Sequence, residues 1–166
     1  MDKNFNIIGL LSLIFAMFIW GSSFIDLKAA MEDLGSFTVI FIRMVAAFLC
    51  FVYFIKDFLK YTFTKEDIKY IFILALFEPC FYFIFEAKAL ELTSASQAGM
   101  IASLMPLITA IAAGYFLKEI ITGKLILGST IAMIGVIALS VQATTSEAAP
   151  NPMAGNFLEF LAMSCA

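Results

Sequence analysis

The sequence predicts an all-α, multi-pass bundle of transmembrane helices, with five complete spans and the start of a sixth. Of its 166 residues, 63% are hydrophobic and 14% are charged, whereas soluble domains average about 45–50% and about 25%. The mean hydropathy is +1.00. The apolar residues also gather into runs close to the length of about 20 residues that crosses the hydrocarbon core of a bilayer.

Composition also excludes several classes of function. The net charge is −3, so the chain lacks the excess of positive charge that a nucleic-acid-binding protein needs. It contains no His, which rules out Ser/His and Cys/His catalytic sets, and no glycine-rich phosphate loop occurs. Cys50, Cys80 and Cys165 are far apart and form no Cys-x-x-Cys pair. We therefore expect no enzyme, metal, cofactor or disulfide.

Five apolar segments are expected to cross the membrane, and only two of them contain a charge. Arg43 lies in the second segment and Glu78 in the third. Pro106 lies in the fourth, where we expect it to kink the helix. The five spans are residues 7–25, 37–55, 70–85, 98–117 and 125–141, and the third is expected to extend about one turn further at each end.

A sixth apolar run begins at about Met153 and reaches Ala166 after fourteen residues. This is too short to span the hydrocarbon comfortably, so we expect the chain to be part of a longer protein. A native re-entrant or interfacial C-terminus is the alternative.

Two segments with similar patterns predict an internal repeat. Residues 9–17 and 155–163 share Gly, Ala and Met at matching positions. A second copy of a five-span unit would insert upside down, giving the inverted repeat of many secondary transporters, with a substrate site near the midplane. We thus expect a first repeat over 1–141, an extracytoplasmic linker over 142–152 and the start of a second repeat over 153–166. The missing C-terminal repeat, or a second copy of the chain, would complete the bundle.

Lysines predict the orientation, because positive charge accumulates in cytoplasmic loops. Lys3 precedes the first span, whereas the connections on the opposite side hold only Lys28 and Lys88. The connections on the side of Lys3 contain Lys56, Lys60, Lys65, Lys69, Lys118 and Lys124. We expect a cytoplasmic N-terminus and a location in the inner (plasma) membrane.

Ionisable residues within the spans are the first candidates for function, because each costs about 2.5–3.5 kcal/mol to insert. Glu78 lies near mid-span, next to Pro79, which removes a backbone donor. It is either a substrate or proton site, or a structural carboxylate paired with Arg43 or with hydroxyls. Arg43 lies about 9 Å along its helix, and its guanidinium can bind a carboxylate with two hydrogen bonds. That carboxylate belongs either to the protein or to a substrate.

Four further residues are weaker candidates. Tyr82 follows Glu78 by four positions and shares its helix face. Trp20 either belongs to an interfacial belt or lines a cavity. Glu86 and Lys88 are expected at a solvated rim.

Small residues recur every four positions in the fourth and fifth spans. This spacing favours close packing of helices in lipid over a binding role. The residues concerned are Ser94, Ala98 and Ala102, then Ala95, Gly99 and Ser103, and lastly Gly128 and Ala132.

A series of motifs over residues 7–141 follows a recognisable order. It begins with Ile-Trp-Gly-Ser-Ser-Phe at 19–24 and Lys28, and continues with Arg43 before a pair of alanines. Later members are Ala89-Leu90, Thr93-Ser94-Ala95, Pro106-Leu107, Phe116-Leu117, Glu119, Gly128 and Gly135-Val136. The series resembles the EamA-like members of the drug/metabolite transporter superfamily. Lys118, where the family usually has Gly, and the acidic residues Glu78 and Glu86 depart from its pattern.

The resemblance implies a ten-helix transporter of small metabolites, built from two inverted five-helix repeats. We expect a secondary transporter that works by alternating access and exports a small metabolite such as an amino acid. Arg43 and Glu78 would hold the zwitterion, and Glu78 would accept a proton as the substrate leaves. The alternatives are a transporter of a lipid-linked sugar or lipophilic cation, and a non-transporting membrane subunit.

Overall fold

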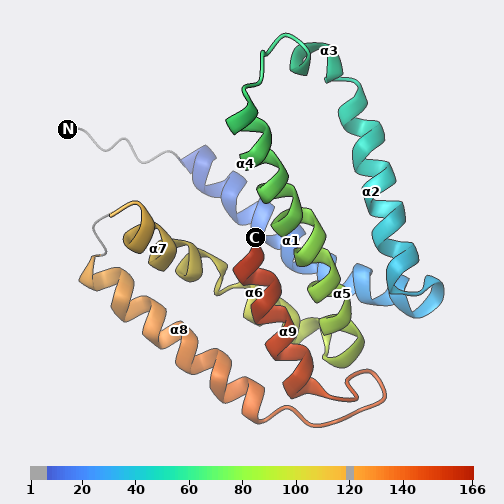
Figure 1. Ribbon diagram of the computed structural model, residues 1–166. Helices are drawn as coiled ribbons and strands as arrows, with labels where there is room; N and C mark the ends of the chain where they lie inside the picture. The colour runs from blue at the N-terminus through green and yellow to red at the C-terminus, as the bar shows by residue number, and fades with distance from the viewer. Residues whose placement is uncertain (1–6, 119–121) are drawn as a thin grey trace.

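Helices make up the secondary structure of residues 7–118 and 122–166, the part of the chain that the computed structural model describes (Figure 1). The all-α prediction is thereby confirmed for these residues. Lys3 and Glu119 lie outside them. In chain order the helices are α1 (Ile7–Leu34), α2 (Ser36–Val52), α3 (Ile55–Phe58), α4 (Lys65–Ala75), the π-helical η1 (Leu76–Phe81), α5 (Tyr82–Leu92), α6 (Ala95–Ala102), α7 (Met105–Phe116), α8 (Gly123–Val141) and α9 (Pro152–Cys165).

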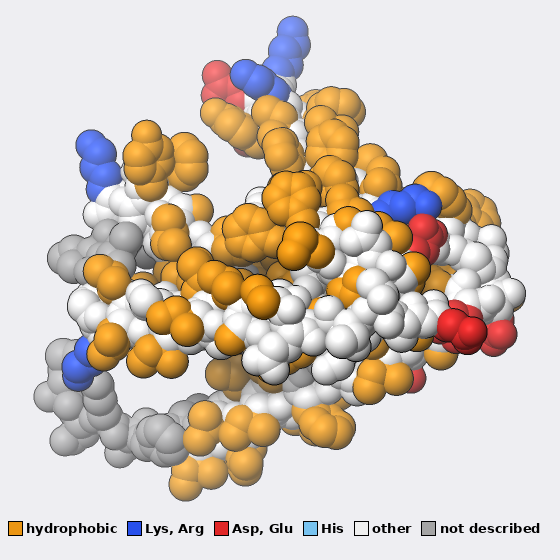
Figure 2. All heavy atoms as spheres, turned by 90° about the horizontal axis from the view of Figure 1, so that it is seen from below, with side chains coloured by type: hydrophobic (Ala, Val, Ile, Leu, Met, Phe, Trp, Pro, Cys, Tyr) orange, Lys and Arg blue, Asp and Glu red, His pale blue; other side chains and the backbone are white. Residues whose placement is uncertain are grey.

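Four helical stretches of the described chain are long and apolar enough to cross a membrane. They are Ile7–Leu34, Lys65–Leu92, Ala95–Phe116 and Gly123–Val141. The second predicted span corresponds to α2, which is apolar but has 17 residues, so the count of five spans stays a prediction. Figure 2 shows hydrophobic side chains spread over one face of the molecule, with most charged side chains towards its margins. Such a surface suits contact with lipid.

The third predicted span is one helical stretch with a local distortion in its middle. Pro79 cannot donate a backbone hydrogen bond and restricts the residue before it. Glu78 accordingly has φ −128° and ψ 116°, which is extended backbone within a helix. Glu78 thus interrupts the regular helix next to Pro79. The stretch begins at Lys65 and continues through α5 to Leu92, so it extends beyond residues 70–85 at both ends, as predicted, and by more than one turn.

The fourth predicted span is interrupted as well. Its first part, α6, ends at Ala102, and α7 begins at Met105 with Pro106 in its first turn, where a missing N–H is tolerated. The predicted kink at Pro106 is confirmed. Ala98 and Ala102 are buried, in agreement with close helix packing. The small residues of α8 are not buried in this way. Helix α8 packs on few other helices of the described chain, and Gly128 is exposed.

The connections with few lysines lie together at one end of the molecule, at the lower right of Figure 1. Lys28 of α1 donates from Nζ to the backbone oxygens of Leu90 at 2.7 Å, Thr93 at 2.6 Å and Ala148 at 2.6 Å. One ammonium therefore satisfies carbonyl groups at the C-terminal end of α5, which have no partner within their own helix. It also joins α1 and α5 to the connection before α9. Which side of the membrane this end faces stays a prediction.

Helix α9 packs along α5 more extensively than any other pair of helices in the described chain. The two backbones come close at Gly155, where an added Cβ would lie 2.7 Å from Thr93 Cβ and 2.9 Å from the Ala89 oxygen. Beside this contact, Thr93 Oγ1 donates to Asn156 Oδ1 at 2.7 Å, and Asn156 Nδ2 donates to Gln97 Oε1 at 2.6 Å. These contacts hold α9 in a defined position against α5 and α6.

Gly155→Ala should therefore destabilise the protein, because the new methyl group meets backbone atoms that cannot move aside. We expect a loss of about 1–3 kcal/mol, typical of overpacking, measured by unfolding of the full-length protein in detergent micelles. Gly128→Ala is the matched control, since an added Cβ there meets no atom within 4 Å. It should be neutral or stabilising by up to about 1 kcal/mol. Equal effects of both substitutions would contradict the close approach of α9 to α5.

Candidate functional site

A buried carboxylate with two donors forms the centre of the site. Glu86 Oε2 accepts a hydrogen bond from Arg43 Nη1 at 3.0 Å, and its Oε1 accepts one from the Tyr82 hydroxyl at 2.7 Å. Glu86 is 3% exposed. A carboxylate buried to this degree requires such partners, because its desolvation is otherwise uncompensated. Arg43, Tyr82 and Glu86 are called the charged cluster below.

Local structure explains why these three side chains meet. Gly35 has φ +78°, a conformation that favours glycine, and there the chain reverses from α1 into α2. Tyr82 and Glu86 are four residues apart on α5 and share one face of that helix. The Arg43 guanidinium carbon also lies 4.4 Å from the ring centroid of Phe83, a favourable position for a cation.

Arg43 connects the buried carboxylate to an open cavity. Its side chain is 38% exposed, whereas that of Glu86 is 4% exposed. The cavity has a volume of about 270 Å³ and lies between α1 and α2; its lining includes Ser23, Asp26, Val39 and Arg43. A ligand in this cavity could reach the guanidinium without unfolding of the bundle.

The structure separates Glu78 from the charged cluster. Glu78 is exposed on η1, and the carboxylate that binds Arg43 is Glu86. A functional role for Glu78 therefore stays a prediction. Trp20 is partly buried, packs against the hydrophobic core and has its ring centroid 6.4 Å from that of Phe24.

The two residues expected at a solvated rim have different environments. Glu86 is buried, contrary to that expectation, because the helix continues to Leu92 and places it within the packed region. Lys88 is exposed and forms an ion pair with Glu91 at 2.7 Å, as a residue at a rim would.

Sequence reasoning missed Glu159. This residue of α9 is 0% exposed, and neither carboxylate oxygen has a hydrogen-bond partner among the described residues. It interacts electrostatically with Glu86 and Tyr82. A lone charge in an apolar run was the signal that identified Arg43 and Glu78. The same signal is present in the apolar run of residues 153–166, where Glu159 is the one charged residue.

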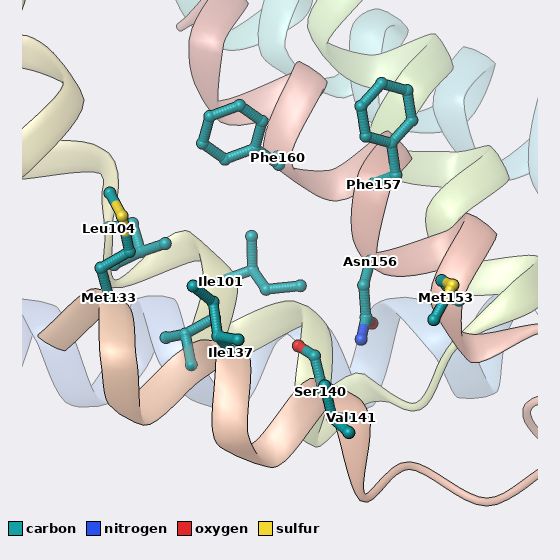
Figure 3. Close-up of a pocket in the computed structure, with 11 residues that line it drawn as sticks. Ile101, Leu104, Met133, Ile137, Ser140, Val141, Met153, Asn156, Phe157 and Phe160 are labelled. Carbon is teal, nitrogen blue, oxygen red and sulfur yellow. The ribbon is translucent and has the colours of Figure 1, made fainter.

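An apolar groove lies between α6, α8 and α9, with a volume of about 340 Å³ (Figure 3). Phe157 and Phe160 of α9 line one side, and Met133 and Ile137 of α8 line the other. Asn156 supplies one of the few polar groups at its wall. Among the described residues, no group of three or more His, Cys, Asp or Glu side chains is placed to hold a metal ion.

Comparison with known proteins places this bundle in a family. The model of the EamA-like transporter family matches residues 7–141. The chain belongs to this family. As a member of the EamA-like family with four helices long enough to span a bilayer, it is a multi-pass membrane protein.

One curated relative comes from Bacillus subtilis (strain 168) and is named "Uncharacterized transporter YcxC". It is 34% identical over 103 residues, which are 61% of this chain and 33% of that protein. The EamA-like chain thus spans about a third of the length of the curated relative that it matches. No solved structure matches it.

Arg43→Met should destabilise the protein by about 1–3 kcal/mol, because it leaves a buried carboxylate with one donor fewer. The double variant Arg43→Met with Glu86→Gln should recover part of this loss, since the neutral amide needs no counter-charge. Unfolding of the full-length protein in detergent measures the coupling as a double-mutant cycle.

Lys88→Met is the control for that cycle, because its ion pair with Glu91 is exposed and surface pairs contribute at most about 1 kcal/mol. Additive effects of the Arg43 and Glu86 substitutions would show that the two side chains do not depend on each other.

Proposed function

We propose that the chain is the N-terminal part of a secondary transporter in the inner membrane, with its N-terminus in the cytoplasm. The family supports transport, and the lysine distribution supports the orientation. The substrate would be a small metabolite such as an amino acid, moved by alternating access and in the direction of efflux. The observation that carries this proposal is the charged cluster, in which a buried carboxylate meets an arginine that faces a cavity.

The charged cluster can exchange its internal ion pair for contacts with a zwitterion. In the empty site the charges of Arg43 and Glu86 neutralise each other. A substrate carboxylate would take the exposed side of the guanidinium with two hydrogen bonds, and a substrate ammonium would bind Glu86. Tyr82 would keep one carboxylate oxygen in place throughout. Each buried charge would still have a counter-charge after the exchange. The exchange would therefore not add the high free-energy cost of an unpaired charge in a bilayer.

Two distorted helices supply the places where the bundle could bend. The third predicted span is distorted at Pro79, and the fourth is divided at Pro106. Broken helices near the membrane centre are typical of secondary transporters, because backbone groups freed there can face a cavity. In this proposal Glu78, exposed beside Pro79, would contact substrate or proton only when other helices cover η1.

Transport by the full-length protein in proteoliposomes tests the proposal, with a panel of radiolabelled zwitterionic amino acids as probes. Arg43→Met and Glu86→Gln should each lower the rate at low substrate concentration by about 30-fold or more, because losing one partner of a buried charged contact costs about 2–5 kcal/mol. Glu147→Gln, in the exposed connection before α9, should transport at the wild-type rate.

Glu78→Gln in the same assay decides whether that residue belongs to the mechanism. Full activity in both Arg43→Met and Glu86→Gln would remove the charged cluster from the transport pathway. Loss of folded protein without loss of flux per folded molecule would show that the charged cluster only assembles the helices. Absence of flux of every probe in the wild type would favour a non-transporting subunit.

A second candidate substrate is a lipophilic cation, which the apolar groove favours. The groove has phenylalanines on one wall; it would suit an apolar ligand, and the faces of these rings could attract the positive charge. Flux of tetraphenylphosphonium, with no flux of any amino acid in the panel, would select this candidate.

A further inference from the structure

Two buried carboxylates lie on the packed helices α5 and α9, and only one of them has hydrogen-bond donors. Glu86 of α5 accepts hydrogen bonds at both oxygens, one from Arg43 and one from Tyr82. Glu159 of α9 accepts none from the residues that the structure describes. The two carboxylates interact electrostatically. Arg43 therefore pairs with Glu86, and Glu159 is left without a counter-charge among the described residues.

Charge balance requires a further positive charge at this place. With both carboxylates ionised, Arg43 would leave one net negative charge in an apolar bundle, which is prohibitively costly without compensation. Within the described chain, the helices packed against α9 supply no other cation that interacts with Glu159. On α5, Glu86 and Tyr82 interact with it, whereas Lys88 is exposed and pairs with Glu91. The titratable residues of η1 are Glu78 and Cys80, and both are exposed.

The other helices that pack against α9 do not change the charge balance around Glu159. Helix α6 contains no ionisable side chain, α7 has only the exposed Tyr115, and α8 has only Lys124, exposed in its first turn. Cys165 is the other titratable residue of α9 itself within the described chain.

The site favours the smallest cation. Glu159 has 0% of its surface exposed, and α9 is held against α5 by the backbone contact at Gly155. An alkali ion would need several oxygen ligands and room for them, whereas a proton needs one oxygen. Because Glu86 already has two donors that stabilise its ionised form, the proton belongs on Glu159.

We propose that Glu86 and Glu159 form a carboxylate pair that holds one proton, and that this proton resides on Glu159. With the proton on Glu159, the charges of Arg43 and Glu86 balance each other, and the pair adds no net charge to the bundle.

Infrared spectroscopy of the purified full-length protein tests the proton site without any transport. A protonated carboxylic acid has a C=O stretching band that an ionised carboxylate lacks. At neutral pH the wild type should show one such band from a group shielded from solvent exchange, and Glu159→Gln should lose it. Glu147→Gln, at an exposed position, should keep it. Persistence of the band in Glu159→Gln, or its loss from the wild type on adding NaCl at constant pH, would overturn the proposal.

Discussion

The arrangement of the helices depends on one constraint, which is that the buried Glu86 carboxylate needs hydrogen-bond donors. Apolar contact between helices is a weak guide in a bilayer, because lipid tails are as apolar as leucine. A buried carboxylate is different, since it is stable only where donors reach it. Arg43 can reach Glu86 only if α2 folds back along α5, and Tyr82 can reach it only from the same face of α5. The polar contacts therefore orient two helices that apolar side chains alone would leave free to rotate.

The positions of the helices could be predicted from the sequence because the physics that sets them is local. In lipid every backbone polar group must be satisfied within its own segment, so a long apolar run becomes a helix. The distortions at Pro79 and Pro106 were predictable for the same reason, since a missing donor acts on its own helix. The full length of the third span and the burial of Glu86 were not predictable, because they depend on the packing of α5 against α9, which lies far away in the chain.

The partners within the site depend on the rotation and register of helices, which hydropathy does not encode. Tyr82 illustrates this, because it is four residues from Glu78 and four from Glu86. On the side of Glu78 the regular spacing is lost in η1, whereas on the side of Glu86 the helix is intact. Tyr82 therefore donates to Glu86. Sequence reasoning grouped Arg43 and Tyr82 with Glu78 as candidate site residues, whereas in the structure both side chains donate to Glu86.

The triple contact of Lys28 has a mechanical consequence. A single ammonium ties together three chain segments at one end of the bundle. Rotation of α1 against α5, or of either helix against the connection before α9, would have to break hydrogen bonds to this group. As long as these bonds hold, the three segments move as one unit.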